Sequence, residues 1–262
     1  MEGPKTEKIE AMFDAIAGDY DRLNHLLSLG VDRLWRKQAL KEIFPTASCC
    51  CGKAPQRGDR SLEILDLACG TGDFSLAMAR YARKKKQGVH ITGLDLSAGM
   101  LDVMRRKVFR SGFGVVAAAS LERQGASVIT TVQGNSEALP FEEGCFDRVT
   151  IAFGIRNVEH REVALREILR VLRPGGRLVI LELSVPAHPV LRRAYNLYFT
   201  RVLPLIGGWI SGDKAAYRYL PASVLRFPGK EEWMQTMRSC GFDNVRHCAL
   251  SLGICRMFLG EK

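Results

Sequence analysis

A short apolar run that stops at a glycine turn constrains the fold of this chain more than any other feature. The run is Ile64 to Ala68, and the turn is Gly70-Thr71-Gly72. Apolar residues then recur at the i, i+3, i+4, i+7 spacing of an amphipathic helix, at Phe74, Ala77, Met78 and Tyr81. Strand, glycine turn and helix form the first half of a nucleotide-binding βαβ unit, because glycine lets the backbone approach a ligand where a Cβ atom would clash.

The residues of this turn favour a ligand without phosphate. A dinucleotide-binding turn carries a third glycine where the pyrophosphate meets the helix N-terminus, and this turn lacks it. Asp73 follows instead, an anion at the position where a phosphate would bind. S-adenosylmethionine (SAM) has a cationic part and no phosphate. The turn therefore predicts a SAM site that includes Gly70 and Gly72.

The next predicted strand, Val89 to Leu94, ends at an acidic residue, Asp95. A carboxylate at the carboxyl end of the second strand can accept hydrogen bonds from both ribose hydroxyls of a bound nucleoside. The alternative is a helix N-cap, because Asp95 or Ser97 could satisfy free N–H groups at the start of the following helix. We predict ribose binding for Asp95 and the cap for Ser97.

The later strands continue the alternation. The third, 128–133, is followed by Asn135, whose amide could read adenine or simply form a turn. The fourth, 148–153, leads into Gly154-Ile155-Arg156-Asn157, and the fifth is 178–183. Short strand–helix alternations of this kind predict an α/β fold with a doubly wound, mostly parallel sheet. Its ligand crevice lies at the strand carboxyl ends, where Gly70, Asp95, Asn135 and Arg156 all fall.

The length of 262 residues and a hydrophobic content of 47% predict one domain, 1–262, with a single closed core. We expect N-terminal helices over 5–44, a SAM-binding core over 62–183, a helical cap insertion over 184–228, and a closing helix with an antiparallel strand pair over 229–262. The closing pair brings the predicted sheet to seven strands. The cap insertion carries an apolar stripe of Leu191, Tyr195, Tyr198, Val202 and Ile206.

Composition restricts the partners and the compartment. The formal net charge of +10 predicts an anionic partner, either a nucleic acid or an anionic membrane surface. Charged residues interrupt the N-terminus and no long apolar run follows, so we expect a cytoplasmic protein without a spanning helix. The eight cysteines are typical of reduced thiols. Cys49-Cys50-Cys51 has no second ligand pair at metal-binding spacing, so we expect no metal.

Three further stretches complete the pattern. The first is Met12-Phe13-Asp14 with Tyr20-Asp21, Asn24 and Leu29 to Arg36; the second is Phe153 to Val158; the third is Tyr217 to Leu220 with Ser223 and Phe227-Pro228. Together with the glycine turn they resemble the SAM-dependent C-methyltransferases of ubiquinone and menaquinone biosynthesis, the UbiE/MenG type. The likeness covers nearly the whole chain except loops near 45–61 and 113–126. It implies the fold of a class I SAM-methyltransferase, which is Rossmann-like.

The resemblance also assigns roles to residues. It implies SAM contacts at Thr71, Asp95, Asn135 and Ser136. Ala152 stands where the family commonly has a serine, so the resemblance implies a backbone contact with SAM there instead of a hydroxyl contact. The implied catalytic residues are Arg156 and Asn157, next to the transferred methyl group.

The family methylates a carbon of a reduced quinone ring that carries a polyprenyl tail. The resemblance therefore implies conversion of demethylmenaquinol to menaquinol, or methylation of the ubiquinol precursor 2-polyprenyl-6-methoxy-1,4-benzoquinol. The quinol must lose a hydroxyl proton as the carbon–carbon bond forms. Arg156 could stabilise the phenolate charge and Asn157 could orient the ring oxygen. Candidate proton acceptors are Asp21, His25 and His160.

Other functions and partners follow from the same residues. A basic methyltransferase could instead modify RNA or DNA, and an RNA methyltransferase is the remote alternative. Amino methylation of a flipped base usually uses an Asn/Asp-Pro-Pro-aromatic tetrad after the fourth strand, and C5 methylation uses a Pro-Cys nucleophile. Residues 153–157 have neither motif, so we expect no nucleic acid partner. A SAM-binding regulator without activity would not need the aromatic cap.

Because a polyprenyl tail lies in the bilayer, we expect peripheral binding to the anionic inner face of the membrane through the cap stripe and Arg192, Arg193 and Arg201. A homodimer is left open.

Overall fold

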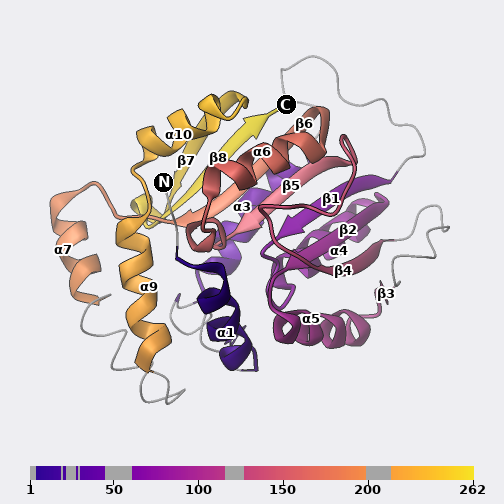
Figure 1. Ribbon diagram of the computed structural model, residues 1–262, viewed down its shortest axis with the longest axis horizontal. Coiled ribbons are helices and arrows are strands. Elements are labelled where there is room, and N and C mark those ends of the chain that lie inside the picture. The colour runs from indigo at the N-terminus through magenta and orange to yellow at the C-terminus, as the bar shows by residue number, and fades with distance from the viewer. Residues whose placement is uncertain are drawn as a thin grey trace.

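The computed structural model describes residues 4–18, 20–21, 28, 30–44, 61–115, 127–198 and 214–262. Within these ranges the chain forms an eight-stranded sheet in the order β3-β4-β2-β1-β5-β6-β8-β7 (Figure 1). The strands are β1 (Leu62–Leu67), β2 (Val89–Asp95), β3 (Gly114–Val115), β4 (Val128–Gln133), β5 (Phe146–Ala152), β6 (Leu172–Leu183), β7 (Asp243–Leu250) and β8 (Cys255–Glu261). β8 runs antiparallel to its neighbours β6 and β7, and the other neighbouring pairs are parallel.

Helices cover both faces of the sheet. On one face lie α3 (Asp32–Ile43), α4 (Asp73–Lys85) and α5 (Ala98–Arg110), and on the other lie α6 (Arg161–Val171) and α10 (Lys230–Ser239). Successive residues of β1 point to opposite faces, so Ile64 packs in the core under α3, α4 and α5, whereas Leu65 packs under α6 and α10. Both side chains are fully buried. A strand buried on two faces is apolar throughout, which is why β1 shows a continuous run and no alternation.

The remaining elements gather at the carboxyl ends of the parallel strands. They are α1 (Thr6–Ile16), η1 (Ile155–Asn157), α7 (Pro189–Leu197), α9 (Lys214–Arg226) and η3 (Ser251–Gly253). α1 packs against α5, and α9 packs against η1. Figure 1 shows α7 and α9 together on one side of the sheet, with α1 below its centre in this view. In the described part of the chain no helix is long and apolar enough to cross a bilayer.

The prediction of a doubly wound, mostly parallel sheet with added helices is confirmed. All seven predicted strands are present, and the two-residue strand β3 adds an eighth because Gly114 and Val115 pair with Val128 and Ile129. β6 begins earlier than predicted, at Leu172, because Leu172 pairs with Phe146. The Cys49–Cys51 loop lies outside the described residues, as do Val202 and Ile206 of the cap stripe. The division into segments stays a prediction.

Candidate active site

A cavity lies where β1, β2, β4 and β5 end, and α1 closes its other side. The described residues that line it include several predicted site residues: Gly70, Asp95, Asn135, Ser136, Ala152 and Asn157. Thr6, Ile9, Glu10 and Phe13 of α1 form the opposite wall, together with Tyr20. The register of parallel strands brings these polar groups to one edge of the sheet, as the order of the strands predicts.

Asp95 is the carboxylate that lines the cavity at the end of β2. Its Oδ2 accepts a hydrogen bond of 2.7 Å from the Gly70 N–H, and its Oδ1 accepts one of 2.9 Å from the Ser97 N–H. Burial raises the pKa of Asp95, although these backbone donors act in the opposite direction. An ionised carboxylate has about four acceptor sites, so both oxygens keep capacity for a hydroxyl donor. This geometry fits a ribose diol.

The helix cap near Asp95 is made by another residue. Ser97 is the N-cap of α5, and its Oγ accepts a 3.0 Å hydrogen bond from the Met100 N–H. The expectation for Ser97 is confirmed, and Asp95 is left to line the cavity. The Asp95 carboxylate therefore does not serve as the α5 cap, which was the alternative to a ligand role.

Asn135 follows β4, the strand that pairs with β2, and it also lines the cavity. Its Oδ1 accepts a 2.9 Å hydrogen bond from the Glu137 N–H, so the side chain forms a turn of its own. The two N–H donors lie at the other end of the amide. Asn135 thus forms the turn and also lines the cavity beside Ser136, while its contact with adenine stays a prediction.

Thr71 and Gly72 lie behind the cavity and are not among its described lining residues. The Thr71 Oγ1 donates to Asp21 and accepts from Lys107 Nζ at 3.3 Å. Gly72 has a φ of +80°, and a Cβ there would come within 2.4 Å of Met104 Cγ. These residues set the shape of the turn, Thr71 through its hydroxyl and Gly72 by allowing α5 to pack closely.

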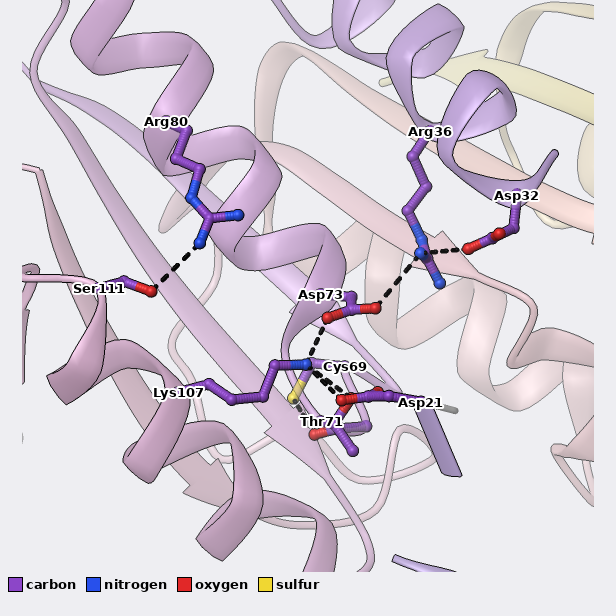
Figure 2. A network of polar contacts seen from close by, with 10 residues as sticks. Asp21, Asp32, Arg36, Cys69, Thr71, Asp73, Arg80, Lys107 and Ser111 are labelled. Atoms are coloured by element: carbon purple, nitrogen blue, oxygen red, sulfur yellow. Dashed lines mark hydrogen bonds and ion pairs between the residues drawn. The ribbon is translucent and has the colours of Figure 1, made fainter. Parts of the chain in front are cut away.

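Lys107 and Arg36 join the turn to the N-terminal segment through carboxylates (Figure 2). Lys107 Nζ lies 2.7 Å from Asp21 Oδ2 and also contacts Asp73. Arg36 pairs with Asp32 at 2.7 Å and with Asp73 at 3.6 Å. Asp73, which suggested a ligand without phosphate, is therefore held by two cations of the protein itself.

The two candidate proton acceptors that the structure describes, Asp21 and His160, are not among the residues that line the cavity. Asp21 belongs to the network around Lys107, and it is not among the described lining residues. His160 is exposed and lies at the N-cap of α6, while His25 is outside the described residues. The identity of the proton acceptor stays a prediction.

Arg156 lies in η1, buried to 6% exposure, and forms an ion pair with Glu182 at the end of β6. Arg156 Nη1 lies 2.7 Å from Glu182 Oε1, and the Arg156 backbone N–H donates to Glu182 Oε2 at 3.1 Å. Burial favours the neutral guanidine, but Glu182 outweighs that effect, and the pKa of Arg156 is raised. Arg156 Nε also donates to Ser223 Oγ of α9 at 3.3 Å.

Asn157, the next residue, lines the cavity at the ends of β1, β2, β4 and β5, which we call the SAM-side cavity. Tyr219 of α9 donates a 2.8 Å hydrogen bond to Asn157 Oδ1. This bond leaves the two N–H groups of the amide as the donors for a ligand. The two predicted catalytic residues are therefore each held by α9, Arg156 through Ser223 and Asn157 through Tyr219.

Sequence reasoning missed Glu182 and Asp66, two carboxylates inside apolar strands. Asp66 accepts hydrogen bonds from Ser75 Oγ at 2.5 Å and Thr150 Oγ1 at 2.7 Å, and burial raises its pKa to about 6. An acidic residue within an apolar run is the signal that could have found both, because a buried carboxylate needs partners. The partners themselves come from distant segments.

The role of α1 in closing the cavity was also missed. The Thr6 N–H and Thr6 Oγ1 each donate to Glu159 Oε2 at 2.9 Å, which caps the start of α1. Near its other end, Asp14 accepts from Ser97 Oγ and from the Gly99 N–H at the start of α5. These contacts hold α1 across the cavity.

The sheet, the glycine turn and the carboxylate after β2 define a class I SAM-dependent methyltransferase. Solved structures agree on the fold. The [4+2]-cyclase SpnF matches with a TM-score of 0.65 at 16% identity, covering 100% of this chain and 98% of that one. A SAM-dependent methyltransferase from Thermotoga maritima matches with a TM-score of 0.57 at 20% identity, covering 97% and 99%.

The chain belongs to the ubiE/COQ5 methyltransferase family, whose model matches residues 1–262. The ubiquinone/menaquinone biosynthesis C-methyltransferase UbiE of Geotalea daltonii is 43% identical over 98% of this chain and 97% of that protein. The demethylmenaquinone methyltransferase of Porphyromonas gingivalis is 39% identical over 100% and 95%. That of Thermus thermophilus is 41% identical over 96% and 100%.

Replacing Asp95 with Ala is expected to weaken SAM binding by roughly ten- to a hundredfold. The reason is the loss of charge-assisted hydrogen bonds, at about 1.5–3 kcal/mol. Isothermal titration calorimetry measures the affinity, and circular dichroism checks the fold, because the Gly70 and Ser97 amides lose their acceptor. Asp95→Asn keeps an acceptor and should show a smaller loss of SAM affinity.

Asp102→Ala is the matched control, since it removes the same charge from an exposed position on α5. Equal SAM affinity in Asp95→Ala and wild type would exclude a direct contact.

Proposed function

We propose that this protein transfers the methyl group of SAM to a ring carbon of a polyprenylated quinol, with demethylmenaquinol as acceptor and menaquinol as product. The observation that carries the proposal is the position of Asn157, which lines the SAM-side cavity while Arg156 stands beside it under α9. Relatives named demethylmenaquinone methyltransferase support this choice of acceptor. Relatives named for both ubiquinone and menaquinone biosynthesis support the ubiquinol precursor as the second candidate acceptor.

Bound SAM supplies an electrophilic methyl group, and the protein must make the acceptor carbon nucleophilic. Asn157 offers amide N–H donors on the wall of the cavity, and Tyr219 fixes which end of the amide faces the ligand. A quinol oxygen that accepts such a bond carries less of the charge that develops as its proton leaves. Positioning of the two reactants supplies the remaining rate enhancement.

Arg156 contributes a fixed positive field beside this oxygen. Its Nη1 and Nε are engaged by Glu182 and Ser223, so the guanidinium is held in one orientation. Glu182 offsets part of the positive charge of Arg156. The Arg156–Glu182 pair therefore acts on the quinol as an oriented dipole. Such preorganised groups stabilise charge without rearranging during the reaction.

Arg156 is expected to affect turnover far more than SAM affinity. Arg156→Lys should lower turnover of a short-chain demethylmenaquinol at saturating SAM, and the double variant Arg156→Met/Glu182→Gln should lower it by roughly 10²–10³-fold, as loss of one oxyanion donor does elsewhere. The double variant avoids leaving Glu182 buried and unpaired, which costs about 3–5 kcal/mol of stability. Product is counted by liquid chromatography and mass spectrometry.

Arg166→Met is the matched control for this assay, because it removes an exposed arginine of α6. The proposal is wrong about Arg156 if the double variant is folded, binds SAM and turns over at the wild-type rate. Offering the benzoquinol precursor in parallel decides between the two acceptors.

The proposal includes a cytoplasmic location at the inner face of the membrane, bound peripherally. Supporting it, α7 exposes apolar and basic side chains together: Val190 is 69% and Leu197 53% exposed, and Arg192 and Arg193 are exposed between them. Leu225 on the neighbouring α9 is 58% exposed. Tyr195 is buried, so within the predicted stripe it belongs to the core, and Arg201 lies outside the described residues.

Binding to anionic vesicles should depend on the two α7 arginines. Each basic residue near such a surface contributes about 1 kcal/mol, so Arg192→Gln/Arg193→Gln should weaken binding by roughly thirtyfold. Sedimentation with phosphatidylglycerol vesicles measures the bound fraction, and rising salt should reduce it. Arg106→Gln/Arg110→Gln removes the same charge from exposed positions on α5. Equal losses for the two pairs would mean that net charge, and not α7, governs binding.

A further inference from the structure

The space beneath α9 holds more buried positive charge than negative charge. Within the described residues three arginines are buried, Arg156, Arg161 and Arg256, at 6%, 4% and 8% exposure. The buried carboxylate in this region is Glu182. Its oxygens accept from Arg156 and from the Leu183 N–H at 2.8 Å. Arg161 donates to the Arg156 carbonyl at 2.9 Å and stacks on Phe227, and it has no carboxylate partner among the described ion pairs.

Arg256 is the arginine of this group that faces a cavity. It lies on β8 directly opposite Glu182 of β6, yet no ion pair within 4.0 Å joins it to any carboxylate in the described ranges. Its side chain makes one long polar contact within the described residues: Nη1 lies 3.5 Å from His247 Nδ1. Burial and Arg256 both lower the pKa of His247, so this ring supplies no anionic partner for the guanidinium. A guanidinium is rarely buried to this extent without an anionic partner.

The cavity beside Arg256 lies between β6, β8, α9 and the start of α10, and its volume is about 280 Å³. We call it the Arg256 cavity. Apolar side chains line part of it, with Leu183, Val224, Phe227 and Phe258 among them. Arg256 and Lys230 are the charged residues among its described lining. Lys230 forms an ion pair with Glu231, with 3.0 Å between Lys230 Nζ and Glu231 Oε1. None of the described residues lines both this cavity and the SAM-side cavity.

The residues that line the Arg256 cavity indicate which class of ligand would fit it. A planar guanidinium fork binds phosphate oxygens in pairs, and burial strengthens that interaction. Apolar walls next to the fork suit the hydrocarbon that follows a headgroup. We propose that the Arg256 cavity is a second binding site, which takes a phosphate group either as the headgroup of a lipid or as the free ion. This site does not depend on the acceptor proposed for methyl transfer.

The test is the midpoint temperature of unfolding with SAM present throughout, so that the SAM-side cavity is filled. The probes are inorganic phosphate, dihexanoyl-phosphatidylglycerol and, as a zwitterionic comparison, dihexanoyl-phosphatidylcholine. A ligand that binds only the folded state raises the midpoint. We expect phosphate or phosphatidylglycerol to raise it in wild type and in the control Arg238→Met, which removes an exposed arginine of α10.

Arg256→Met should lose this response. Without any probe it should unfold no earlier than wild type, because the change removes a buried charge that has no carboxylate partner. Arg256→Lys keeps the charge and loses the fork, so its affinity for the same probe should fall at least tenfold, and it serves as the second variant if Arg256→Met does not fold. A response to phosphate alone identifies the free ion, and a response to phosphatidylglycerol alone identifies the lipid. The proposal is overturned if no probe shifts wild type, if Arg256→Met shifts as wild type does, or if Arg256→Lys binds with wild-type affinity.

Discussion

The buried ion pair between Arg156 and Glu182 holds the acceptor side of this protein together. It joins the end of β6 to η1, and through Ser223 it joins both to α9. Breaking such a pair by removing one partner leaves an uncompensated charge in the interior, at a cost of about 3–5 kcal/mol. Asn157 is the next residue of the same turn, so the ion pair and the Tyr219 hydrogen bond together fix where η1 presents Asn157 to the cavity.

The cofactor side depends on a different set of contacts. Asp95 accepts from the backbone of the glycine turn, so β1 and β2 fix each other at the edge of the cavity. Behind the turn, Lys107 links the carboxylates of Asp21 and Asp73, and α1 is held at its two ends by Glu159 and by the start of α5. The N-terminal segment is thereby coupled to the turn that shapes the SAM site.

Several features of this arrangement could be predicted from the sequence. The strands and their order follow from apolar runs that alternate with helical stripes, and parallel strands bring Gly70, Asp95 and Asn135 to one edge. The cap at Ser97 could be predicted because capping is local: the residue bonds to an N–H three positions along the chain. Arg156 and Asn157 could be predicted as catalytic residues only from the resemblance to the family.

The partners of these residues could not be predicted, because they come from distant segments. Glu182 and Arg156 are separated by 26 residues, and Asn157 and Tyr219 by 62. The hydroxyl of Thr71 bonds to Asp21 and Lys107, which no local pattern indicates, and its contact with SAM stays a prediction. The excess of buried arginine beneath α9 emerges only from the register of β6 with β8, which sets Arg256 opposite Glu182.

The central claim is that the protein methylates a reduced ring whose hydroxyl proton leaves as the new bond forms. The most direct measurement is methyl transfer from isotopically labelled SAM to a short-chain demethylmenaquinone, with dithionite to reduce the ring and without it. Methylated product should form only with the reductant, because the oxidised ring has no hydroxyl proton to lose. Equal product formation from the oxidised quinone would contradict the claim.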